Sequence, residues 1–106
     1  MGTYIMLSTL TDDGSKTLKE KPNRLKEVNQ ELEQMGVKIL NQFATLGPYD
    51  FVNILEAPDN ETIAKISVEM AARGTVRFLT LPAIPIDQFI ENLKGKPLVG
   101  GERKVA

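Results

Sequence analysis

With 106 residues, of which 42% are hydrophobic, the chain is long enough for one compact domain and short for two. Its formal net charge of -1 provides no positive field that would attract nucleic acid or an anionic membrane surface. It has no cysteine and no histidine, which removes disulfides, thiolate chemistry, the usual metal ligands and the usual general base near neutral pH. We therefore expect no metal, haem or other cofactor, and no nucleic-acid partner.

The first residues contain no basic segment that leads into a long apolar run, so they lack the form of a signal peptide. No window approaches the roughly eighteen consecutive apolar residues that a membrane-spanning helix needs. From both observations we expect a cytoplasmic protein with no membrane partner.

Residues 3–10 have strand composition, with apolar side chains on both faces. Thr11 and the two aspartates after it favour a helix start, because a hydroxyl caps the first turn and negative charge suits the positive end of the dipole. The helix predicted over residues 12–35 has an apolar stripe and a charged face, which includes Glu31 and is expected to be solvated. Pro22 removes an intrahelical hydrogen bond, so we expect a kink or break at the two preceding residues.

Two further runs of branched and aromatic residues, 37–46 and 50–57, predict strands joined as a hairpin. Gly47 can take a positive φ at the turn, and the Asp50 side chain can accept hydrogen bonds from nearby backbone amides. Tyr49 and Asp50 offer a phenol and a carboxylate that could line a pocket and handle a proton. Turn chemistry alone also accounts for both residue types, so both interpretations stay open.

Asp59 is placed to cap a second helix, which Arg73 and Gly74 would close. The helical spacing predicts that one stripe of this helix is buried. That stripe comprises Ile63, Ile66, Met70 and Ala71.

Residues 75–81 predict a fourth strand, and Pro82 and Pro85 are expected to end its pairing. Apolar residues at helical spacing predict a short helix over residues 85–93. The glycine-rich segment 95–106 predicts a mobile tail, or an arm held by a neighbouring molecule.

The order strand, helix, strand, strand, helix, strand is that of a ferredoxin-like βαββαβ fold in the α+β class, here a single domain over residues 1–94. Two helices would cover one face of a four-stranded antiparallel sheet. The strands do not alternate cleanly between apolar and polar residues, so the second face is also apolar and needs a cover. We expect a second copy of the chain to cover it, giving a homodimer with two sheets packed face to face. The short C-terminal helix could reach across the dimer or cover its own sheet edge.

Polar residues are scattered through these apolar strands and need hydrogen-bond partners if they are buried. They could line a cavity between sheet and helices or between subunits, satisfy one another across the dimer, or lie in water at strand ends. They are Tyr4, Ser8, Gln42, Asn53, Arg77 and Thr80. Together with the turn, they supply the candidate ligand-binding residues Gly47, Tyr49, Asp50, Tyr4, Asn53 and Arg77.

Several short motifs, in this order and spacing, resemble the GYD domain family. They are Gly47, Tyr49 and Asp50 between two strands, Glu56-Ala57-Pro58-Asp59, Leu10-Thr11-Asp12, Pro22, and Gly74-Thr75-Val76-Arg77. The resemblance covers about residues 3–89 and leaves the tail beyond Leu93 outside. It implies a ferredoxin-like fold of the dimeric α/β barrel type, but no activity, because the function of that family is uncharacterised. Gly47, Tyr49 and Asp50 match the motif that gives the family its name.

Three functions are compatible with these observations. The first is a dimeric protein that binds or senses a small molecule in a pocket near Tyr49 and Asp50. The second is a cofactor-independent enzyme, such as a monooxygenase or isomerase, by analogy with other dimeric barrels. A cavity that holds two of the acid and base candidates Asp50, Glu56, Tyr4, Tyr49 and Arg77 would favour the enzyme. The third is a structural association module, expected to be a dimer without a cavity.

Overall fold

The computed structural model describes residues 1–95, so the tail predicted over 95–106 lies, apart from Gly95, outside the described residues. The described part contains four strands and four helices. In chain order they are β1 (Gly2–Leu10), α1 (Asp12–Glu20), α2 (Arg24–Gln34), β2 (Lys38–Ala44), β3 (Phe51–Ala57), α3 (Asn60–Ala71), β4 (Val76–Ala83) and α4 (Ile86–Lys94).

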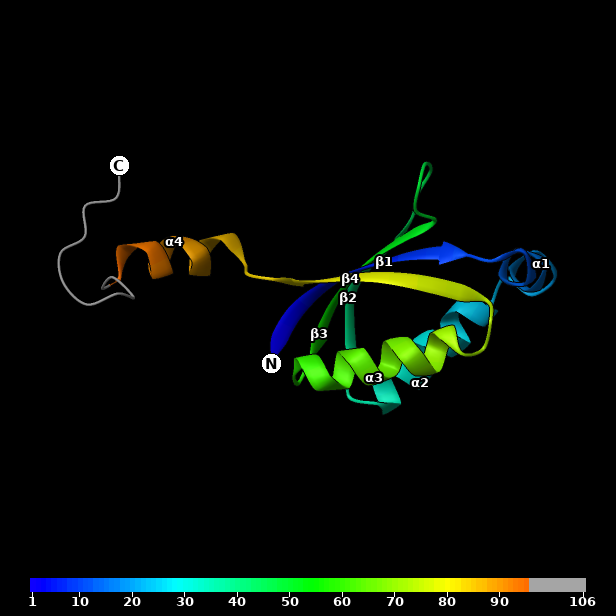
Figure 1. Cartoon of the computed structure of the whole chain (residues 1–106), viewed down its shortest axis with the longest axis horizontal. Helices are drawn as coiled ribbons and strands as arrows, with labels where there is room; N and C mark the ends of the chain where they lie inside the picture. The colour runs from blue at the N-terminus through cyan, green and yellow to red at the C-terminus, as the bar shows by residue number, and fades with distance from the viewer. Residues whose placement is uncertain (96–106) are drawn as a thin grey trace.

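The four strands form one antiparallel sheet in the order β2-β3-β1-β4. Helices α2 and α3 lie on one side of this sheet (Figure 1). This arrangement confirms the predicted α+β, ferredoxin-like fold with a four-stranded antiparallel sheet and a short C-terminal helix. Among residues 1–95, none of the helices combines the length and apolar character required to cross a membrane.

The helix predicted over residues 12–35 is broken into α1 and α2 around Pro22, as expected. Thr11 caps α1, since its side-chain oxygen accepts a hydrogen bond from the backbone N–H of Gly14 at 3.1 Å. The break allows α1 to turn away from α2 and to lie at the far end of the sheet (Figure 1). Residues of α1 can therefore close one end of the space beneath the sheet.

The fourth strand is longer than predicted, because pairing continues through Pro82 to Ala83. Pro82 lies opposite Tyr4, and Ala83 lies opposite Thr3. The prediction that Pro82 ends the pairing was wrong because β4 is an edge strand. On the outer side of an edge strand, the missing backbone N–H of a proline breaks no hydrogen bond to a neighbouring strand.

The buried core lies between the sheet and the helices. Its members are Tyr4, Met6, Leu32, Val37, Leu55, Ala57, Ile63, Ile66 and Met70. Three of the four residues predicted for the buried stripe of α3 are in this core, but Ala71 is exposed. Ala71 directly follows Met70, and one residue turns a helix by about 100°, which moves it off the stripe.

The opposite face of the sheet carries no helix in the described residues, and we call it the open face. Pairing aligns two rows of side chains across all four strands on this face. One row is Phe43, Val52, Leu7 and Leu79, and the other is Asn41, Ile54, Ile5 and Leu81. Phe43 is 55% exposed, and Leu79 and Leu81 are each 46% exposed. The prediction of strands that are apolar on both faces is confirmed.

Helix α4 projects away from the sheet at the end of an extended continuation of β4 (Figure 1). Its four large apolar residues are Ile86, Phe89, Ile90 and Leu93, and all of them are exposed. The helix therefore does not cover the edge of its own sheet, which was one of the two expected positions.

Candidate functional site

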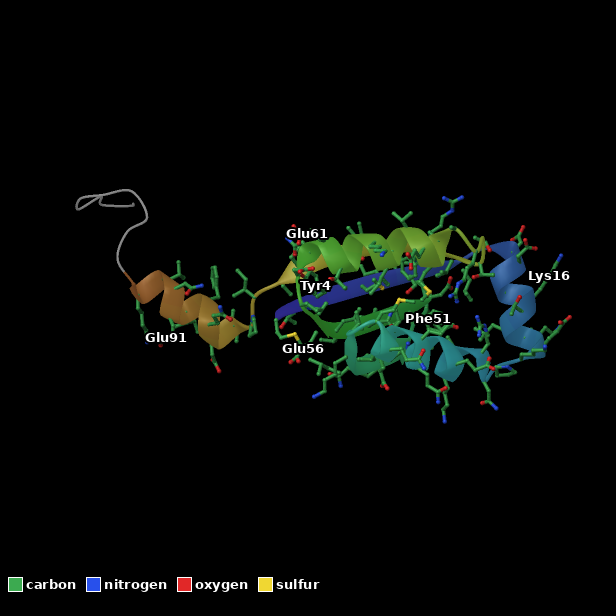
Figure 2. All side chains as sticks on the ribbon, turned by 90° about the horizontal axis from the view of Figure 1, so that it is seen from below. Tyr4, Lys16, Phe51, Glu56, Glu61 and Glu91 are labelled. Carbon is green, nitrogen blue, oxygen red and sulfur yellow. The ribbon has the colours of Figure 1, made fainter. Side chains whose placement is uncertain are left out.

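A cavity of about 260 Å³ lies between the covered face of the sheet and helices α1, α2 and α3. Most of its lining side chains are apolar, and they come from all four strands and all three helices. Phe51, on the covered face of β3, lies between the ribbons of α2 and α3 (Figure 2). The interior between sheet and helices is therefore incompletely filled by the side chains around it.

Asn53 is the centre of a hydrogen-bonded network along the cavity and is only 7% exposed. Its Nδ2 atom donates to Met6 O at 3.0 Å and to Ser8 Oγ at 3.1 Å. Its Oδ1 atom accepts from Gln42 Nε2 at 2.8 Å, and Asn29 Nδ2 on α2 donates to Gln42 Oε1 at 2.8 Å. This chain of amides fixes the polar groups of the cavity from the central strands out to α2.

Two arginines and one glutamate form an ionic cluster beside the cavity. Arg73 follows the end of α3, and its Nη2 atom donates a hydrogen bond to Glu31 Oε2 on α2. Arg24 Nη2 lies 3.3 Å from Glu31 Oε1. The hydrogen bond from Arg73, followed by the positive charges of Arg73 and Arg24, holds the pKa of Glu31 below its usual value. Glu31 in turn raises the pKa of Arg73. Both arginines line the cavity, and the cluster links the start of α2 to the end of α3.

The turn residues fasten the hairpin to β1. Gly47 has a φ of 104°, the positive value that the sequence predicted for it. Asp50 Oδ2 accepts a hydrogen bond from the backbone N–H of Leu10 at 2.7 Å, and the backbone N–H of Asp50 donates to Ser8 O at 2.8 Å. These bonds correspond to the structural interpretation of Asp50, which is not among the residues that line the cavity.

Replacing Asp50 with alanine should lower the free energy of unfolding by about 1–2 kcal/mol, because the Leu10 amide would lose a charged acceptor. Asp50→Asn keeps an acceptor oxygen in the same place and should recover more than half of that loss. Urea unfolding of the two variants beside the wild type would measure both changes. If both variants unfold at the wild-type midpoint, the hydrogen bond contributes nothing to stability.

The remaining candidate side chains are distributed over separate parts of the molecule. The carbonyl of Tyr49 accepts a hydrogen bond from Thr45 Oγ1, within the hairpin. The hydroxyl of Tyr4 donates to Asn60 Oδ1, at the start of α3. Arg77 is exposed and shares the open face with the residues described above. Of the six candidate residues, the cavity contains only Asn53.

This distribution bears on the alternative functions. The criterion for an enzyme was a cavity holding two of the acid and base candidates, and none of Asp50, Glu56, Tyr4, Tyr49 and Arg77 is among its lining residues. The criterion for a pure association module was the absence of a cavity, and a cavity is present. The cavity therefore lacks the pair of acid and base candidates that the enzyme interpretation required, and it has room for a ligand.

Sequence reasoning missed the ionic cluster, because it assigned Glu31 to a solvated helix face. One signal was present: Arg24 and Glu31 are seven residues apart, which places them on the same side of α2 two turns apart. The second arginine, Arg73, had been interpreted only as a cation at the end of a helix. Its approach to Glu31 depends on how α2 and α3 pack, which no local pattern encodes.

These features define an α+β domain of ferredoxin-like topology with an apolar cavity beneath its helices and an uncovered apolar sheet face. The chain belongs to the GYD domain family, whose family model matches residues 4–93. A protein of Thermus thermophilus named glutamine synthetase and cystathionine beta-lyase binding protein is 55% identical over 95 residues. That match covers 89% of this chain and 100% of the relative.

Proposed function

We propose that this protein is a homodimeric binding protein that attaches to another protein through helix α4. The name of the Thermus thermophilus relative describes a protein that binds glutamine synthetase and cystathionine beta-lyase. An identity of 55% over the whole length of that relative supports a protein-binding role here. Glutamine synthetase and cystathionine beta-lyase are accordingly the first partners to test.

The observation that carries the proposal is the exposed apolar side of α4. Ile86, Phe89, Ile90 and Leu93 follow one another at spacings of three, one and three residues and form a single stripe. Ile86 is 67% exposed and Leu93 is 70% exposed. A helix of nine residues without tertiary packing is marginal in water, so α4 needs a surface to pack against. An amphipathic helix that inserts into a groove of another protein is a common form of recognition.

The open face supports self-association as the second part of the proposal. It is continuous across four strands and apolar in both rows, apart from Asn41. An uncovered apolar face of this kind is rare on a soluble monomer. Charged residues lie at the ends of the apolar rows: Lys38 and Glu56 are paired across β2 and β3 at one end, and Arg77 lies opposite Thr9 at the other. A two-fold axis brings identical surfaces together, and an apolar centre flanked by charged residues is suited to that symmetry.

The two surfaces have separate roles in this proposal. The open face belongs to the sheet, whereas α4 stands beyond the end of β4 (Figure 1). Packing a second copy on the open face therefore leaves the α4 stripe available for a different protein. Each dimer would present two copies of α4, which increases apparent affinity for an oligomeric partner.

The test uses purified glutamine synthetase and cystathionine beta-lyase from the organism that produces this protein. Each enzyme is titrated with the full chain by calorimetry. We expect the wild type to bind at least one of them. The double variant Phe89→Ser and Ile90→Ser removes the centre of the stripe and should weaken binding at least about tenfold. The matched control, Gln88→Ser and Glu91→Ser, changes the polar side of the same helix and should bind within about twofold of the wild type.

Three results would contradict the proposal in distinguishable ways. If the wild type binds neither enzyme, the partner assignment is wrong. If the stripe variant binds as tightly as its polar-side control, α4 is not the binding element. If the stripe variant becomes monomeric in light scattering while the control stays dimeric, α4 is part of the self-association surface instead.

A further inference from the structure

The cavity beneath the helices is partly open to solvent, and its large volume and mostly apolar lining suit a small ligand. Protein interiors are close-packed, and voids larger than a water molecule are few. A cavity of about 260 Å³ has many times the roughly 10–15 Å³ that one water needs. Ordered water also needs several polar partners, while most of this lining is apolar. An apolar ligand would gain dispersion contacts with these lining side chains.

The floor of the cavity offers one buried hydrogen-bond donor. Ser8 is 5% exposed, and its Oγ atom accepts a hydrogen bond from Asn53 Nδ2. A serine hydroxyl both accepts and donates, and within residues 1–95 Ser8 Oγ donates to no protein group. The amide of Asn53 is held by Met6 and Gln42, so the Ser8 oxygen has a fixed position.

The cluster at the helix ends offers positive charge. Arg24 and Arg73 both line the cavity, and they share the single carboxylate of Glu31. Arg24 also lies 3.5 Å from Glu27, but the side chain of Glu27 is 61% exposed and is not among the lining residues. Neither Glu27 nor Glu31 is among the lining residues, so the lining itself contains two guanidinium groups and no carboxylate. Guanidinium groups bind carboxylates in planar, bidentate geometry.

We propose that this cavity binds a small apolar monocarboxylate. Its carboxylate lies at Arg24 and Arg73, and its apolar body packs against Phe51, Leu55 and Met70. A carboxylate is the charged group that two guanidinium groups favour in a lining that contains no acidic side chain. The apolar body gains dispersion contacts with the apolar side chains of the lining. The site lies on the covered face of the sheet, so it is independent of both surfaces assigned above to protein association.

Octanoate is a suitable probe, because it combines an eight-carbon chain with one carboxylate. Calorimetric titration of the full chain should detect saturable binding of one octanoate per chain. Octylammonium has the same chain with the opposite charge and should bind at least about tenfold more weakly, since it would face the two arginines. Equal affinity for the two probes would overturn the assignment of the charged end.

Two variants locate the site. Arg24→Gln should weaken octanoate binding at least about fivefold, whereas Lys26→Gln removes an exposed cation on the same helix and should change it less than about twofold. Val28→Phe places a larger side chain in the lining and should weaken octanoate at least about tenfold, with circular dichroism showing an intact fold. If octanoate does not bind the wild type, or if both cavity variants bind it normally, the proposal is wrong.

Discussion

Leu7→Lys should convert the proposed homodimer into a monomer, with self-association weakened at least about a hundredfold. Leu7 lies on the open face between Val52 on β3 and Leu79 on β4, at the middle of an apolar row. In the proposed dimer, a second sheet covers this row and removes it from water. A lysine there would bury an unpaired charge, which costs several kcal/mol, whereas in the monomer its ammonium group reaches water. Light scattering after size-exclusion chromatography would report the mass of each species.

Val68→Lys is the matched control for this experiment. Val68 lies on α3 and is 69% exposed, so the same type of substitution there places a charge in water. We expect this variant to stay dimeric. A dimer that persists after Leu7→Lys would show that the open face is not the interface, and a wild type that is monomeric at high micromolar concentration would remove the dimer from the proposal.

Gly14→Ala should destabilise the fold by about 3 kcal/mol, although alanine is the better helix former by about 1 kcal/mol. A Cβ atom at Gly14, in the first turn of α1, would lie 1.9 Å from the carbonyl oxygen of Thr75. That oxygen accepts a hydrogen bond from the backbone N–H of Thr11 at 3.1 Å, and Thr11 Oγ1 donates to Gly74 O at 2.7 Å. The start of α1 is therefore held against the start of β4 too closely for any side chain.

The sign of the change in unfolding free energy distinguishes the steric effect at Gly14 from helix propensity, because helix propensity alone predicts that Gly14→Ala stabilises the protein. Ser15→Ala, at the next and exposed position of α1, tests propensity without the close approach and should stay within about 0.5 kcal/mol of the wild type. Urea unfolding gives both values. A Gly14→Ala variant that unfolds at or above the wild-type midpoint would contradict the close packing at this junction.

Several elements were predictable because their causes are local. Pro22 breaks the helix through its own missing N–H, and Thr11 and Asp59 cap the helices that follow them. Gly47 adopts the positive φ that the turn needs. The fold class followed from the order of these elements, and the uncovered sheet face followed from strands that are apolar on both sides.

The candidate site was predictable only in part. Asn53 attracts attention as an amide in an apolar strand, and it lies in the cavity. Tyr49 and Asp50 are equally conspicuous, but their position at the hairpin end directs them to turn and strand contacts. A polar residue in a sequence indicates that a partner is needed, and it does not specify whether the partner is the backbone, another side chain or a ligand.

The sequence by itself determined the order of strands and helices, their caps and the apolar character of both sheet faces, because these depend on residues near one another in the chain. Only the tertiary structure decided that Pro82 continues a strand, that Arg73 reaches Glu31, and that α4 stands apart from its own sheet. The cavity also belongs to this second group. Its existence depends on the distances between α1, α2, α3 and the sheet, and such distances arise from packing among segments that are remote in sequence.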